Sequence, residues 1–166
     1  SRESDKPYGR WSTILIGPPQ HNIAIVTAYI VCNTPITPDR HYTATYQQWL
    51  LVSRKGIKGH SREKAIKDLI QHITNLITQG NDVILMMDAN STRDANNSVL
   101  KEIHEKCGLV EFNLHQDMVI PTYRYGTQQV DFMMVTNKIV PYIAQGHIQE
   151  FGLICNSDHR SIIVDI

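Results

Sequence analysis

The spacing of apolar and polar residues divides the chain into strands and helices. An unbroken apolar run from Val83 to Met87 ends at Asp88, with turn-forming residues on both sides. Such a run predicts a strand that is buried on both faces of a sheet. A carboxylate at the C-terminal tip of a buried strand lies where α/β proteins often place their chemistry, although Asp there is also a common turn former.

Five other segments have the composition of strands. Two β-branched runs, 11–17 and 22–31, flank Pro18 and Pro19, and this arrangement predicts an antiparallel hairpin. Further short strands are expected in the last third of the chain, together with one brief extended piece at 122–125. These strands are predicted at 130–135, 143–151 and 161–166.

Helical spacing is found between the two groups of strands. Helices are expected at 42–52, from Ser61 as N-cap to Gly80, and from Asn97 or Ser98 to Gly108. The second helix has a continuous apolar stripe and should pack on a sheet. Strands, then helices, then strands predict α/β layers built on a mixed sheet. The stripe consists of Ala65, Ile66, Leu69, Ile70, Ile73, Leu76 and Ile77.

Length and composition are those of an ordinary globular chain. The 166 residues, 42% hydrophobic and 19% charged, are enough for one domain spanning 1–166, with no repeat or linker to divide it. No apolar run approaches the ~18 residues of a membrane span, and no signal peptide is visible. Cys32, Cys107 and Cys155 have no metal-type spacing. We therefore expect an intracellular protein, nuclear or cytoplasmic, that does not associate with a membrane.

The formal net charge is zero, which argues against a protein that binds nucleic acid through bulk charge. Phosphates would have to be bound by a local basic patch. A solvated loop and helix face explains the same residues equally well. The candidate patch contains Arg54, Lys55, Lys58, Arg62, Lys64 and Lys67.

Polar residues that could take part in catalysis or bind a metal lie at strand ends or interrupt strands. Asp131 interrupts an apolar strand, and a buried carboxylate must be hydrogen-bonded or charge-compensated, most simply by a histidine. Asp88 and Asp158, if adjacent, would repel each other unless a divalent cation lay beside them. Ligands that are all oxygen favour magnesium or manganese over zinc. The candidates are Tyr29, Asp88, Asn90, Asp131, Asp158 and His159.

Each candidate also has a purely structural explanation. Tyr29 suits a core aromatic residue, Asp131 could pair with a Lys or Arg, and Asp158 could begin a turn. His159 could be a surface residue, and Arg124 a solvated loop residue rather than a contact for a substrate backbone. Taken together, these explanations require several unrelated coincidences. The combined pattern therefore favours a catalytic site.

Four motifs in this order, TAYIVCN, MDAN, QVDFMMV and SDHRSIIVDI, resemble the endonuclease/exonuclease/phosphatase superfamily from about Gly9 to Ile166. GRWS, TAYIVCNT and Gln47–Gln48 are most similar to retroelement endonuclease domains. The resemblance implies a DNase I-like fold, a four-layer sandwich of mixed β-sheets flanked by helices. It also implies a Mg²⁺-dependent endonuclease that acts on DNA, of the repair or retroelement type. A retroelement domain would be fused to or encoded with a reverse transcriptase.

The resemblance also implies roles for the residues after the first two motifs. Tyr29 would contact the scissile phosphate. Asp88 would orient the attacking water or accept its proton, and Asn90 would hold that water or a phosphate oxygen.

The last two motifs supply the remaining roles. Asp131 would orient His159, and His159 would hydrogen-bond the phosphate. Asp158 would bind the metal directly or through water, so Mg²⁺ or Mn²⁺ would lie among Asp88, Asn90 and Asp158. Arg124 is a further candidate for binding the substrate.

The chain departs from the superfamily at its beginning. The superfamily places an Asn and a metal-binding Glu on strands that precede this segment, and Glu3 lies in a polar stretch unlike such a strand. We therefore expect an N-terminally truncated domain that binds magnesium weakly and has little activity. A phosphatase of the same fold that acts on small phosphorylated molecules is one alternative. A non-catalytic, degenerate fragment is the other.

Overall fold

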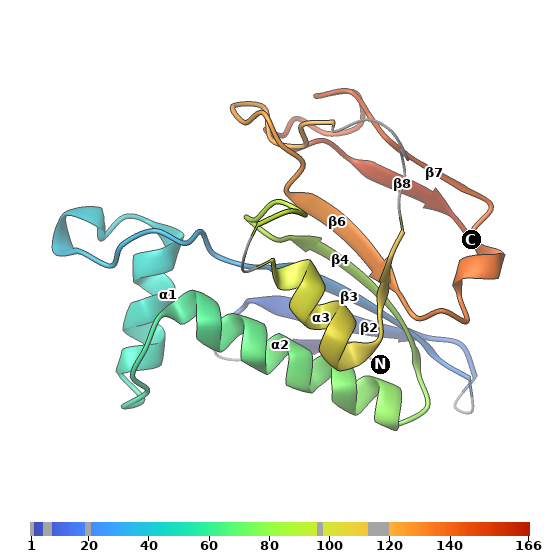
Figure 1. The fold of residues 1–166 in the computed structure, drawn as a ribbon, viewed down its shortest axis with the longest axis horizontal. Helices are drawn as coiled ribbons and strands as arrows, with labels where there is room; N and C mark the ends of the chain where they lie inside the picture. Colours follow the sequence, from blue (N-terminus) through green and yellow to red (C-terminus); the bar gives the residue numbers. More distant parts are fainter. Residues whose placement is uncertain (1, 5–7, 19–20, 96–97, 113–119) are drawn as a thin grey trace.

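A layer of helices covers one face of a six-stranded sheet, and a two-stranded sheet packs on the other face (Figure 1). This computed structural model describes residues 2–4, 8–18, 21–95, 98–112 and 120–166. The larger sheet has the order β1-β2-β3-β4-β6-β5, and β7 pairs with β8. The elements are β1 (Arg2–Ser4), β2 (Trp11–Ile16), β3 (Ile23–Tyr29), η1 (Pro38–Arg40), α1 (Ala44–Ser53), α2 (Ser61–Thr78), β4 (Asp82–Asp88), α3 (Val99–Cys107), β5 (Val110–Glu111), β6 (Asp131–Val135), η2 (Val140–Tyr142), β7 (Gln145–Ile148) and β8 (Ile162–Asp165).

Strand β4 lies inside the larger sheet, as its apolar run predicted. It pairs parallel with β3 and antiparallel with β6, and β2 and β3 form the expected antiparallel hairpin. Val83 and Leu85 face the helices and are fully buried, and Ile84 is buried on the opposite face. The prediction of a mixed sheet flanked by helices is therefore confirmed.

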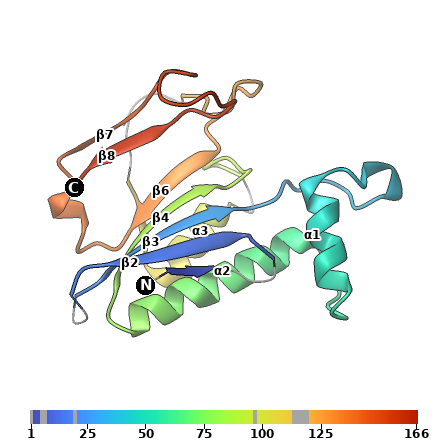
Figure 2. The ribbon, with the colours of Figure 1, turned by 180° about the vertical axis from the view of Figure 1, so that it is seen from behind.

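Helix α2 runs along the sheet with its apolar stripe turned inward, and α3 lies beside it (Figure 2). Removing this stripe from water is the main gain that holds α2 on the sheet. Helix α1 projects beyond the edge of the sheet in both views. None of the described helices is long and apolar enough to cross a membrane.

Two helix ends test the predicted capping residues. Ser61 is not the N-cap of α2: it is buried and donates its hydroxyl to the Thr45 carbonyl. The cap is His60, whose Nδ1 accepts from the Arg62 amide at 3.2 Å. Ser98 precedes α3 as predicted, Gly108 ends it in the left-handed conformation, and Asn97 lies outside the described residues.

The two-stranded sheet covers only part of the larger one. It packs over the β4–β6 half, where Ile84, Met133 and Val135 are buried with Ile139. On the same face of β2, Ile14 is 47% and Ile16 is 53% exposed. Within the described residues, the helices and the two sheets therefore supply three layers, and the second sheet leaves β2 uncovered.

The β2–β3 turn gives a test of this fold. Gly17 has φ +117°, and a Cβ there would lie 2.6 Å from the His21 carbonyl oxygen. Gly59 has a similar φ of +114° with no atom within 4 Å of such a Cβ. Gly59→Ala should therefore lower the free energy of unfolding by about 1–3 kcal/mol through backbone strain alone.

We expect Gly17→Ala to cost at least ~1 kcal/mol more than Gly59→Ala, because an overpacked contact adds to the strain. Urea unfolding followed by circular dichroism measures both variants. Equal losses would contradict the close approach of Gly17 to the His21 carbonyl oxygen.

Candidate functional site

Strand register brings three predicted residues to one edge of the larger sheet. Tyr29 is paired with Asp88 across the parallel β3–β4 ladder, and Asp88 with Asp131 across the antiparallel β4–β6 ladder. Paired residues of neighbouring strands lie on the same face of a sheet. All three therefore lie at the end of the sheet where β3 and β4 finish and β6 begins.

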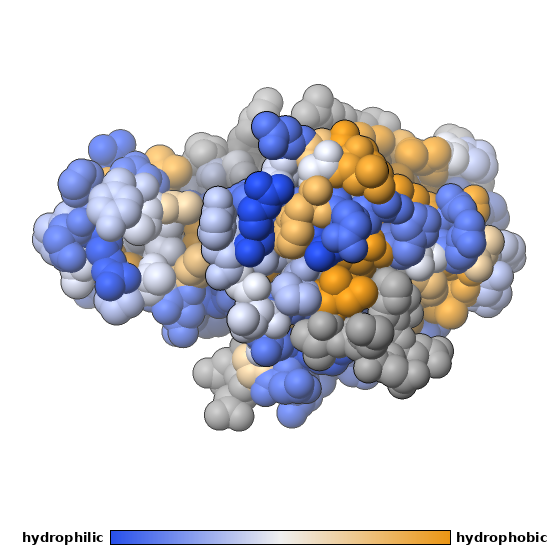
Figure 3. All heavy atoms as spheres, turned by 90° about the horizontal axis from the view of Figure 1, so that it is seen from above, coloured by the Kyte–Doolittle hydropathy of each residue, from blue (hydrophilic) through white to orange (hydrophobic). Residues whose placement is uncertain are grey.

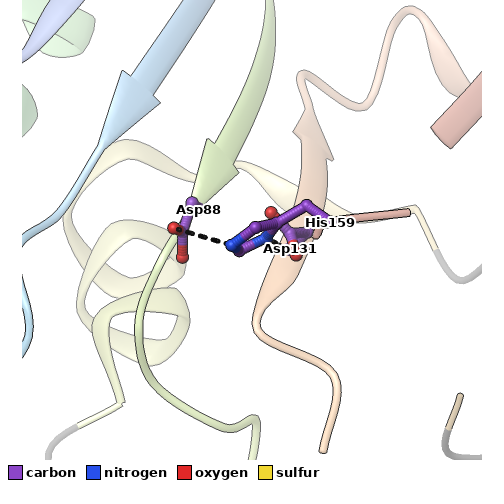
Figure 4. Close-up of side chains that lie close together, drawn as sticks. All are labelled: Asp88, Asp131 and His159. Atoms are coloured by element: carbon purple, nitrogen blue, oxygen red, sulfur yellow. Dashed lines mark hydrogen bonds and ion pairs between the residues drawn. The ribbon is translucent and has the colours of Figure 1, made fainter. Parts of the chain in front are cut away.

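His159 reaches the same edge from the segment before β8 (Figure 4). Its Nδ1 donates to Asp131 Oδ2 at 2.9 Å, and its Nε2 faces Asp88 Oδ2 at 3.9 Å. The second distance is too long for a hydrogen bond, so one water, which both accepts and donates, can bridge it. The Asp131–His159 pairing expected from the sequence is thus present.

Buried Thr122 fixes the backbone on both sides of that pair. Its hydroxyl oxygen accepts from the amides of Val130 at 2.9 Å and Asp131 at 3.1 Å. Its carbonyl accepts from the Arg160 amide at 2.8 Å, directly after His159. One residue therefore holds the start of β6 and the histidine segment in fixed relation.

A tight turn follows Asp88. The Asn90 amide donates to Asp88 Oδ1 at 3.0 Å, and Asn90 has φ +43°, the one positive value among described non-glycine residues. The Asn90 side chain donates to the Ile30 carbonyl at 3.0 Å and accepts from the Cys32 thiol at 2.9 Å. These bonds turn the Asn90 amide nitrogen, rather than its oxygen, toward Asp88.

The surroundings of the site raise the pKa values of both His159 and Asp88. Burial raises the pKa of Asp88, and the nearby charge of Asp131 adds to this, although the Asn90 amide opposes it. Burial alone would lower the pKa of His159, but the hydrogen bond and charge of Asp131 outweigh it and raise this pKa. Burial also raises the pKa of Tyr29, with smaller contributions from Cys32 and Asp88.

The other predicted residues lie around this group. Tyr29 is 37% exposed at the end of β3, so it is not a core residue. Asp158 is exposed next to His159, and its carbonyl accepts from the Arg124 amide at 2.7 Å. The Arg124 guanidinium lies 5.4 Å from the Phe151 ring, and no contact with Asp88 or Asp131 is described.

The donor set fits a divalent cation. Ligand atoms of Asp88, Asp131 and His159 lie within 4.8 Å of one another, so this group could hold a metal ion. Two neighbouring carboxylates repel, and a cation beside them removes that cost. Carboxylate oxygens suit magnesium and manganese.

Three residues that contact the site were not expected from the sequence to do so. Cys32 bonds to Asn90, Thr122 holds Asp131, and Arg62 is buried against the carbonyls of Val31 and Ala89. Helical spacing offered a signal for Arg62, because it lies three and four positions before Ala65 and Ile66 on the apolar stripe. No sequence signal marked Thr122 or Cys32.

A hollow of about 280 Å³ lies beside the acidic group. It is lined by Asp88 and Asp131 together with Thr27, Met86, Arg160 and Ile162, and the Arg160 guanidinium itself is paired with Glu150. From above, the surface mixes apolar and hydrophilic side chains, and the projecting α1 end is mostly hydrophilic (Figure 3). The hollow therefore combines two carboxylates with largely apolar walls.

No model of a protein family and no curated protein sequence matches this chain. The endonuclease domain of TRAS1, a telomere-specific non-LTR retrotransposon, is similar in structure with TM-score 0.53 and 17% identity, over 100% of this chain and 68% of that domain. The AP endonuclease LMAP from Leishmania major has TM-score 0.60 and 14% identity, over 93% and 53%. The 3′ phosphatase NExo from Neisseria, bound to product DNA hairpin, has TM-score 0.61 and 14% identity, over 97% and 66%.

These similarities establish a common fold. They confirm the DNase I-like fold that the resemblance of the four sequence motifs implied. The chain spans 53% to 68% of the length of these structures.

The Asp131–His159 bond can be tested by titration. Asp131→Asn should lower the pKa of His159, because the hydrogen bond to a carboxylate and the charge of Asp131 are lost and only the weaker effects of Asp88 and Asp158 still oppose burial. NMR titration of the imidazole C–H signals measures this, with His159 assigned by its loss in His159→Gln. Asp165→Asn, which removes an exposed carboxylate from β8, is the matched control and should leave the pKa unchanged.

The sign of the effect on stability follows from the raised pKa. The ion pair stabilises the fold fully below the ordinary histidine pKa of 6.5, and this stabilisation is lost as pH rises through the folded-state value. Asp131→Asn should therefore destabilise most at mildly acidic pH, below 6.5 but above the range in which aspartates become protonated. A destabilisation that grows with rising pH would contradict the pairing.

Proposed function

We propose that this chain forms a metal-dependent phosphodiester hydrolase site, that of an endonuclease acting on DNA. The observation that carries the proposal is the Asp131–His159 hydrogen bond, which faces Asp88 across 3.9 Å. The fold neighbours support it, because two are named as endonucleases and a third as a 3′ phosphatase bound to DNA. The repair type and the retroelement type, with an associated reverse transcriptase, are both compatible with these neighbours.

His159 is the group that would meet the phosphate. Its Nδ1 is committed to Asp131, so its Nε2–H is free to point into the space before Asp88. The raised pKa keeps the imidazole charged over more of the neutral range, as a donor to a phosphate oxygen requires. Charge that develops on that oxygen during hydrolysis would be stabilised by a donor already in place.

Asp88 is the group that would handle the attacking water. Its carboxylate accepts from the Asn90 amide on one oxygen, and the other oxygen faces His159. Because burial raises its pKa, Asp88 is a better proton acceptor than an exposed aspartate. Tyr29 is its neighbour in the β3–β4 register and would contact the phosphate from the side.

A divalent cation, Mg²⁺ or Mn²⁺, would neutralise phosphate charge and lower the pKa of a bound water. If His159 became a ligand through Nε2, that nitrogen could no longer donate to the phosphate. We therefore propose that Asp88 and Asp158 hold the cation with Asn90, and that Asp131 keeps orienting His159. The amide of Asn90 would have to turn to offer its oxygen.

A phosphomonoesterase is the second candidate. A fold neighbour that is a 3′ phosphatase supports it, since the same residues can hydrolyse a terminal phosphate. A degenerate, non-catalytic fragment is less well supported. All six predicted catalytic residues are present in the sequence, and the Asp131–His159 pair is hydrogen-bonded.

The endonuclease proposal predicts nicking of supercoiled plasmid that requires Mg²⁺ or Mn²⁺. The protein is used in excess over DNA, so that slow cleavage can be measured. Asp88→Asn and His159→Gln should each reduce the rate at least about 100-fold, the usual contribution of one acid–base group. Asp165→Asn should cleave like the parent protein.

Cleavage that persists in EDTA, or that Asp88→Asn retains, would contradict the proposed site. A DNA hairpin with a 3′ phosphate separates the two candidates. Release of phosphate without plasmid nicking would favour the phosphatase over the endonuclease.

The metal assignment makes a separate prediction. Asp158→Asn should weaken Mn²⁺ binding, measured by electron paramagnetic resonance, by about tenfold or more, as loss of a ligand or its support does. Asp131→Asn should change that affinity much less, because Asp131 is bonded to His159. The reverse order would assign the cation to the Asp88, Asp131 and His159 group instead.

A further inference from the structure

Arg62 is a buried cation that the proposed chemistry does not use. It is only 7% exposed and lies in the first turn of α2. Arginine is seldom buried without a charged partner, and a positive charge is disfavoured at a helix N-terminus. A residue that breaks two local preferences at once points to a role beyond stability.

The Arg62 guanidinium joins the two segments that leave the site. One terminal nitrogen donates to the Val31 carbonyl at 2.6 Å, and the other donates to the Ala89 carbonyl at 3.0 Å. Val31 lies two residues after Tyr29, and Ala89 directly follows Asp88. A planar fork can hold both carbonyls at once with little conformational freedom.

The same segments are tied to the rest of the site by backbone bonds. The Ala89 amide donates to the Val130 carbonyl at 2.8 Å, just before Asp131, and the Ile30 amide donates to the Asp88 carbonyl at 2.9 Å. Ala89 is completely buried between Asp88 and the positive-φ residue Asn90. Holding the Ala89 carbonyl therefore fixes the Ala89–Asn90 peptide, and the bond from the Ile30 amide to the Asp88 carbonyl fixes the peptide before it.

The positive charge of Arg62 lies close to the Asp88 end of the site. Both of its hydrogen-bond acceptors are backbone carbonyls, so within the described residues no carboxylate is bonded to it. An uncompensated buried cation is costly, and burial lowers its pKa. Near neutral pH Cys32 is an uncharged thiol, so the charge that favours the ionised form of Arg62 is that of Asp88, on the site side of the carbonyls.

We propose that Arg62 is a positioning residue that clamps the ends of β3 and β4 and so holds Asp88 and Asn90 in register with Tyr29. The nature of the reaction rests on the proposed function. The clamp itself rests on the two carbonyl contacts. Arg62 acts through Ala89 and Val31 and touches neither substrate nor metal.

Three variants test the clamp. Arg62→Met keeps the aliphatic bulk and removes both donors and the charge. Arg62→Lys keeps the charge, but a single ammonium cannot reproduce the fork. Lys67→Met is the matched control, because it removes one positive charge from the exposed side of α2, within the same groove of about 510 Å³ that Arg62 lines.

Amide hydrogen exchange, measured by NMR, tests whether the clamp holds the two strand ends, and it does not require the protein to be active. In Arg62→Met the amides of Ile30 and Ala89 should exchange about tenfold faster or more, while the Leu69 amide inside α2 keeps its protection. Lys67→Met should change none of them. The proposal would be overturned if all three amides lost protection equally, or if Ile30 and Ala89 kept theirs. If Arg62→Met does not fold, Arg62→Lys serves for the same comparison.

Mn²⁺ affinity and catalysis then show whether the clamp serves the site. In Arg62→Met, Mn²⁺ affinity and kcat should fall about 10- to 100-fold with KM little changed, and Arg62→Lys should recover only part of the loss. Altered exchange at Ile30 and Ala89 with unchanged Mn²⁺ affinity would overturn the positioning role. A parent protein that neither binds Mn²⁺ nor cleaves would instead contradict the proposed function, and the exchange result would still decide the clamp.

Discussion

The pairing of β4 with β3 on one side and β6 on the other decides where every candidate site residue lies. Parallel β3 and β4 finish at the same edge of the sheet, and antiparallel β6 begins there, so Tyr29, Asp88 and Asp131 form one row. A slip of one residue in β4 would turn Asp88 toward the helices and place Met87 at the site. The burial of Val83 and Leu85 under α2 prevents that slip, and packing thereby fixes the chemistry.

Strong periodicity and a charge inside an apolar strand were the signals from which structure could be predicted. The apolar run before Asp88 predicted the buried strand, and the cost of Asp131 in a strand predicted its histidine partner. The sequence could not show which carboxylate lies beside Asp88. Asp131 lies beside Asp88 through strand register, whereas Asp158, which the sequence suggested as the neighbour, is exposed.

Local signals failed where a distant contact competed with them. Ser61 has the right chemistry for a helix cap, but its hydroxyl bonds to the Thr45 carbonyl of the preceding helix, and His60 caps α2 instead. Arg62 stands in a run of basic residues that suggested a solvated surface. Its contacts with Val31 and Ala89 depend on how α2 docks on the sheet, which no local pattern reveals.

The wide separation of the site residues along the chain has a consequence for folding. Tyr29, Asp88, Asp131 and His159 come from four segments, and only long-range pairing brings them together. Contacts between distant segments form slowly, because closing long loops costs entropy before the contacts are made. Helix α2 can therefore form early, whereas the site is complete only when the last strands have docked. In a refolding experiment, the signal that reports the assembled site should recover later than the signal that reports helix content.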